Sequence, residues 1–203
     1  FKPYNFYKRW SNRLLTKSLY GLGPYAIEYP KLDHQGISST SDKHIHLIIV
    51  GMNRMGIALA KEAAHLLHFP NFNESTGANR TRITFIDDNA DIEKDFFVGR
   101  LSRFFDVSPI LYADLSNDSF SEYKVLNPDK EHANFIDVQF EFIKGRVESN
   151  NVRKWIIQEL KDDTAITSMA ICLQDVSKAF AMAMYLPEEV YMRGRNDITK
   201  PWT

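Results

Sequence analysis

The chain has 203 residues, a formal net charge of −1, 44% hydrophobic residues and 25% charged residues. This is the composition of an ordinary globular domain, and the near-zero charge excludes the strongly basic surface of most nucleic-acid-binding proteins, so no nucleic-acid partner is expected. No apolar run in the sequence approaches the ~18 to 20 residues needed to cross a bilayer. The single cysteine, Cys172, cannot form an internal disulfide, which favours a reducing, cytoplasmic setting.

Residues 1–42 are predicted to form an arm and a linker. No acidic residue precedes Glu28, whereas five cations and six aromatic residues occur in the first 20 positions: Lys2, Lys8, Arg9, Arg13 and Lys17, with Phe1, Tyr4, Phe6, Tyr7, Trp10 and Tyr20. This mixture is favoured at the cytoplasmic side of a membrane interface, which indicates a membrane segment or channel N-terminal to Phe1. An arm that packs its aromatic side chains on the folded body is the alternative.

Residues 43–203 are predicted to form one domain in which strands and helices alternate. Four apolar runs predict buried strands, at 45–50, 83–86, 138–143 and 166–173. Each is followed by apolar residues at helical spacing, at 55–67, 92–105, 152–160 and 177–185. Residues 106–134 fit this order poorly and are predicted to be an insertion, with a strand at 109–112. The predicted fold class is α/β, a Rossmann-like doubly wound parallel sheet with an N-terminal basic and aromatic arm.

The turn after the first predicted strand contains two glycines. In a doubly wound sheet, ligands bind beyond the carboxyl ends of the strands, where this turn would lie. Gly51 would allow a sharp turn, and Gly56 would let the following helix lie close to the sheet. Free N–H groups at the helix start would then face an anionic group such as a pyrophosphate. Asp87 or Asp88, at the end of the second strand, would accept hydrogen bonds from ribose hydroxyls.

These segments resemble the RCK or TrkA-type N-terminal domain, the nucleotide-binding module of potassium channel and transporter regulators. The resemblance rests on VGMNRMGIALA (50–60), ITFIDD (83–88), FIKGR (142–146) and ICLQDVSKAFAMAM (171–184). It implies that NAD or NADH, or ATP or ADP, binds to the turn and the acids after it: Gly51, Met52, Asn53, Arg54, Met55, Gly56, Asp87 and Asp88. It also implies that Arg146, Cys172, Leu173 and Gln174 line the base, ribose or nicotinamide side.

Two residues depart from the family pattern. Asn53 replaces the middle glycine of the turn, and it adds a side chain where the backbone would approach the pyrophosphate. Arg146 replaces an aspartate and reverses the charge near the base or ribose, which favours an extra phosphate or abolishes adenosine recognition. A Rossmann-like module without any ligand is therefore a second interpretation.

The function predicted from these patterns is a cytoplasmic regulatory nucleotide-binding module of a potassium channel or transporter-like protein. Because family members pair, the resemblance implies a homo-oligomer. No catalytic residue is assigned. No metal site is assigned either, since His65 and His68 near Glu62 are expected to be surface or capping residues. The alternatives are the cofactor half of an NAD(P)-dependent dehydrogenase and a ligand-free interaction domain.

Overall fold

The structure is a computed structural model that describes residues 5–16, 19–20, 27–28, 32, 36–117, 122–127 and 135–192. The helices are α1 (Phe6–Thr16), α2 (Arg54–Leu66), α3 (Ala90–Arg100), α4 (Asn150–Glu159), α5 (Val176–Tyr185) and α6 (Glu188–Met192), with a 3₁₀ turn at Phe104–Asp106. The strands are β1 (Leu19–Tyr20), β2 (Ile27–Glu28), β3 (His44–Val50), β4 (Thr81–Asp87), β5 (Ile110–Asp114), β6 (Lys124–Val125), β7 (Val138–Lys144) and β8 (Ala165–Ile171).

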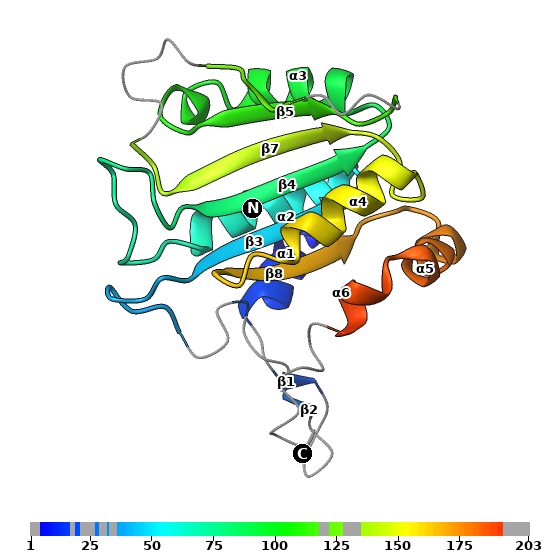
Figure 1. Ribbon diagram of the computed structural model, residues 1–203, viewed down its shortest axis with the longest axis horizontal. Helices are drawn as coiled ribbons and strands as arrows, with labels where there is room; N and C mark the ends of the chain where they lie inside the picture. The colour runs from blue at the N-terminus through cyan, green and yellow to red at the C-terminus, as the bar shows by residue number, and fades with distance from the viewer. Residues whose placement is uncertain are drawn as a thin grey trace.

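A six-stranded sheet in the order β6-β5-β7-β4-β3-β8 forms the centre of the molecule. Strands β5, β7, β4, β3 and β8 run parallel, and only β6 pairs antiparallel, with β5. Helix α2 covers one face of the sheet and α4 the other (Figure 1). The predicted fold class, a Rossmann-like doubly wound α/β fold, is confirmed.

The four predicted buried strands correspond to β3, β4, β7 and β8, and the strand predicted at 109–112 corresponds to β5, but one predicted helix is shorter than expected. The helix expected over 92–105 ends at Arg100, and a turn then leads into the 3₁₀ segment, which buries Phe105 with its ring 5.3 Å from that of Phe140. The predicted insertion supplies β5, which extends the sheet beside β7, and β6. Its residues 118–121 and 128–134 lie outside the described part of the chain.

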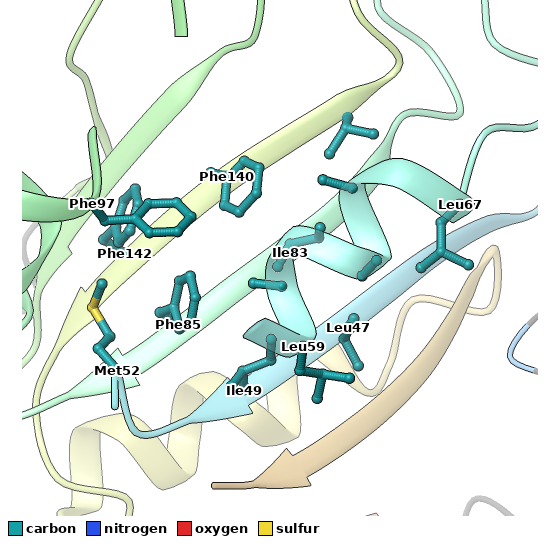
Figure 2. Close-up of a cluster of buried hydrophobic side chains, with 14 of the residues drawn as sticks. Leu47, Ile49, Met52, Leu59, Leu67, Ile83, Phe85, Phe97, Phe140 and Phe142 are labelled. Carbon is teal, nitrogen blue, oxygen red and sulfur yellow. The ribbon is translucent and has the colours of Figure 1, made fainter. Parts of the chain in front are cut away.

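Alternating side chains of the central strands feed two separate cores. Leu47, Ile49, Ile83 and Phe85 point toward α2 and join a cluster that includes Phe97, Phe140 and Phe142 (Figure 2). Ile48, Val50, Ile86 and Ile143 point to the opposite face, where they meet Val152, Trp155 and Ile156 of α4. The period of two along a strand explains why a continuous apolar run is needed for a sheet covered on both sides.

The N-terminal segment contains a helix that packs on the folded body. Trp10 and Leu15 of α1 contact the cluster on the α2 side, and Lys8 Nζ lies 3.7 Å from Glu62 Oε1 of α2. Phe1, Lys2, Tyr4 and Lys17 of the predicted arm, and the side chain of Tyr20, lie outside the described residues. None of the helices that the structure describes is long and apolar enough to cross a membrane.

The sheet face under α4 carries a buried polar cluster near the amino ends of the strands. Arg82 bonds Glu141 through two nitrogens, at 2.7 and 3.0 Å, and Glu159 of α4 at 2.8 Å. Thr84 Oγ1 lies 2.8 Å from Glu141 Oε2 and 2.8 Å from His46 Nε2. Burial, with the Arg82 charge acting in the same direction, lowers the pKa of His46 to about 3, so the imidazole is held neutral.

This pKa predicts an acid-dependent loss of stability. The folded state binds a proton at His46 only near pH 3, whereas the unfolded state binds it near pH 6.5. Stability therefore falls as the pH drops from about 6.5, with a limit of about 1.4 kcal/mol per pH unit for this group. When the free energy of unfolding is measured by urea at several pH values across this range, its slope against pH should be clearly smaller for His46→Gln than for the wild type. The control His65→Gln changes an exposed histidine of α2 and should keep the wild-type slope; an unchanged slope in His46→Gln would contradict the assignment.

Candidate functional site

The carboxyl ends of β3 and β8 form the switch point of the sheet. The two strands are neighbours, yet β3 leads through α2 to β4 on one side, whereas α4 on the other face leads the chain to β8. The strand that follows β3 in the chain therefore lies on the opposite side of β3 from β8 (Figure 1). In open α/β sheets such a divergence produces the crevice in which ligands bind.

Both glycines of the turn occupy positions that exclude a side chain. Gly51 has φ +100°, and a Cβ there would lie 2.5 Å from the carbonyl oxygen of Cys172. At Gly56 a Cβ would lie 2.1 Å from the carbonyl oxygen of Gly51 and 3.2 Å from Ile49 Cγ2. The turn thus packs tightly on both β8 and its own helix, which accounts for both glycines without a ligand.

Asn53 is the N-cap of α2. Its Oδ1 accepts hydrogen bonds from Met55 N at 2.9 Å and Gly56 N at 3.2 Å. Its Nδ2 donates to the carbonyl oxygen of Cys172 at the end of β8. The side chain therefore satisfies two amides of the first helical turn and ties that turn to the neighbouring strand.

The two consecutive acids after β4 have different partners. Asp87 accepts from Met52 N through Oδ2 at 2.8 Å and from Asn89 N through Oδ1 at 2.9 Å. Asp88 instead forms an ion pair with Arg146, at 2.7 Å from Nε, and this pairing raises the pKa of the Arg146 guanidinium. Asp87 thus shapes the turn, whereas Asp88 and Arg146 face the solvent-accessible crevice.

A pocket of about 670 Å³ opens at this edge of the sheet. It is lined by Val50, Gly51, Ile86, Asp87, Asp88, Asn89, Gly145, Arg146, Val147, Glu148, Leu173, Lys178 and Met182. A second pocket of about 210 Å³ shares Asp88, Gly145 and Arg146 with it and adds Ser116 and Ser149. The crevice combines apolar walls with carboxylates and two cations, a mixture that suits a sugar and a flat base better than an entirely apolar ligand.

The structure separates the residues predicted for the site into two groups. Gly51, Asp87, Asp88, Arg146 and Leu173 line the larger pocket. The others, which do not line it, are Met52, Asn53, Arg54, Met55, Gly56, Cys172 and Gln174.

Three of the residues outside the pocket belong to the core. The side chain of Met52 lies beside the phenylalanine cluster (Figure 2), and Met55 packs against the same cluster. Cys172 is 2% exposed, and burial raises the pKa of its thiol to about 11. Arg54 and Gln174, by contrast, are exposed.

The sequence analysis did not assign eight of the pocket residues to the site: Val50, Ile86, Asn89, Gly145, Val147, Glu148, Lys178 and Met182. Lys178 and Met182 come from α5, and Asn89 and Glu148 follow β4 and β7. The signal that identifies them is position alone: residues just after a parallel strand, or in the first turns of the next helix, face the carboxyl edge of the sheet.

No match to this chain was found among protein-family models, curated proteins or solved structures. Within the described ranges, no group of three or more His, Cys, Asp and Glu side chains gathers in a way that would hold a metal ion. Glu62 lies beside Lys8, and His68 Nδ1 lies 2.6 Å from Asp137 Oδ1.

The contacts of Gly56 predict that its replacement destabilises the fold. Gly56→Ala places a methyl group against fixed backbone, so the free energy of unfolding should fall by about 1 to 3 kcal/mol. The matched control is Gly99→Ala in α3, where a Cβ would meet no atom within 4 Å. That change should raise stability by roughly 0.5 to 1 kcal/mol, because alanine is the better helix former. Urea unfolding of both variants provides the test, and equal effects would contradict the packing argument.

Because the two acids have different partners, the same substitution should affect stability at Asp87 and hardly at Asp88. Asp87→Ala leaves the amides of Met52 and Asn89 without acceptors, so stability should fall by about 1 to 3 kcal/mol. Asp88→Ala removes only an exposed ion pair and should leave the unfolding midpoint nearly unchanged. Thermal denaturation compares the two, and a large loss in Asp88→Ala would refute this division of roles.

Proposed function

We propose that this domain binds an adenosine-containing ligand in the larger pocket and acts as a regulatory module without turning the ligand over. The observation that carries the proposal is the convergence of Gly51, Asp87, Asp88, Arg146 and Leu173 on one crevice at the switch point. The volume of about 670 Å³ lies in the range of small-molecule sites, roughly 300 to 1,000 Å³.

The lining chemistry matches the parts of a nucleoside. An ionised carboxylate has about four acceptor positions, so Asp87 keeps free lone pairs beside its two backbone bonds, and Asp88 can exchange its bond to Arg146 for ribose hydroxyls. Leu173 and Met182 offer apolar surface to a base.

Helix α5 is the element that would transmit ligand occupancy. It contributes Lys178 and Met182 to the pocket, and it has no buried residue of its own. Its outer side exposes Val176, Phe180 and Met184, at 80%, 69% and 70%. A ligand that contacts α5 would therefore shift a surface available to another chain, and coupling of ~1 to 3 kcal/mol is typical. We propose a homo-oligomer on this basis, and the link to a potassium channel or transporter is supported by the motif resemblance.

A second candidate function is a ligand-free interaction domain. It is favoured by the internal partners of the turn, because Asn53 and Asp87 satisfy amides that a ligand would otherwise contact. The exposed apolar side of α5 is compatible with this function as well.

Calorimetric titration with adenosine, AMP, ADP and NADH tests the proposed function. We expect binding of at least one of them, weakened about 10-fold or more in Asp88→Ala, because a charged hydrogen bond contributes about 1.5 to 3 kcal/mol. The control Glu188→Ala removes an acid from α6, outside the pocket lining, and should bind like the wild type. Absence of binding to all four compounds at millimolar concentration would favour the ligand-free interaction domain.

A further inference from the structure

We propose that the side chain of Asn53 occupies the phosphate seat of the glycine turn, so that the pocket accepts nucleosides and nucleoside monophosphates and discriminates against dinucleotides. This inference rests on the proposed function and specifies its ligand class. It concerns a residue that departs from the usual glycine of such turns, which leaves room for a pyrophosphate to approach the backbone.

Four amides of the turn and of the first helical turn are already engaged. Gly51 N donates to the carbonyl oxygen of Ile86 at 2.9 Å, and Met52 N donates to Asp87. Met55 N and Gly56 N both donate to Asn53 Oδ1. Asn53 Oδ1 thus takes the position in which a phosphate oxygen would meet the start of a helix.

Asn53 is also held from the other side. Its Nδ2 donates to the carbonyl oxygen of Cys172, so both polar atoms of the amide are used. The same carbonyl lies so close to Gly51 that a Cβ there would be only 2.5 Å away. A pyrophosphate crossing between β3 and β8 would have to break three hydrogen bonds of this side chain.

The open pocket lies to one side of this closed turn. Of the turn residues it includes Gly51 alone, and its ionisable lining consists of Asp87, Asp88 and Glu148 against Arg146 and Lys178. Three carboxylates disfavour a chain of phosphates, whereas two cations suffice for a single one. The ribose and base of a nucleoside fit this lining without contacting the amides of α2.

Removing the Asn53 side chain tests the inference. In Asn53→Gly the two amides become free, and glycine at an N-cap is tolerated nearly as well as asparagine, so the variant is expected to fold. In the control Asn53→Ser, a hydroxyl oxygen again caps the helix, whereas the bond to Cys172 is lost as in the glycine variant. Calorimetry with adenosine, AMP and NADH, and unfolding of each variant, are measured together.

For the wild type we expect adenosine or AMP to bind about 10-fold or more tightly than NADH. Asn53→Gly should raise the affinity for NADH about 10-fold, since two amide donors become available to a charged phosphate, and should leave the affinity for AMP within about 2-fold. Asn53→Ser should resemble the wild type.

The outcomes separate this inference from the proposed function. Binding of NADH as tight as that of AMP in the wild type, or equal NADH affinity in the wild type and Asn53→Gly, overturns the inference while nucleotide binding stands. A gain for NADH in both variants also overturns it, because the contact with Cys172 and not the capping oxygen would then be responsible. Failure of every compound to bind to the wild type and to both variants removes the proposed function and the inference together.

Discussion

The close contact between the turn after β3 and the end of β8 organises the rest of the structure. It joins Asn53 and Cys172, which are 119 residues apart in the chain. The contact consists of the hydrogen bond from the Asn53 amide and the tight approach of Gly51 to the Cys172 carbonyl. Only a residue without Cβ permits that approach, and the Asn53 amide caps α2 with its oxygen while its nitrogen donates to the Cys172 carbonyl. The same contact fixes where α2 starts and closes the space between the two strands.

That closure decides where a ligand can lie. With the amides of Met55 and Gly56 bonded to Asn53, the accessible volume lies toward Asp88, Arg146 and α5, on the α4 side of the sheet. The crevice is thus built from an acid and a cation that pair with each other across two loops, at 2.7 Å. An exposed pair of this kind contributes little to stability, so its opening by a ligand costs little.

The two faces of the sheet have different physical characters. The α2 face is filled by aromatic rings, with Phe85, Phe97 and Phe142 in edge or stacked contact. The α4 face is apolar only toward the carboxyl ends, and its other half holds the ion pairs of Arg82 with Glu141 and Glu159. Removing one partner of such a buried ion pair leaves an uncompensated charge, so this half of the face depends on all three side chains being present.

The sequence by itself determined the alternation of strands and helices, because continuous apolar runs such as residues 47–50 are typical of strands in a sheet covered on both faces. It also identified Gly51 and Gly56 as backbone requirements and Asp87 and Asp88 as neighbours of the turn. Only the tertiary structure decided that Asn53 bonds Cys172, that Asp87 and Asp88 have separate partners, and that Lys178 and Met182 enter the pocket. Periodicity records which face of an element is buried, whereas these contacts depend on strand order and on side-chain rotamers across the carboxyl edge, which no local pattern encodes.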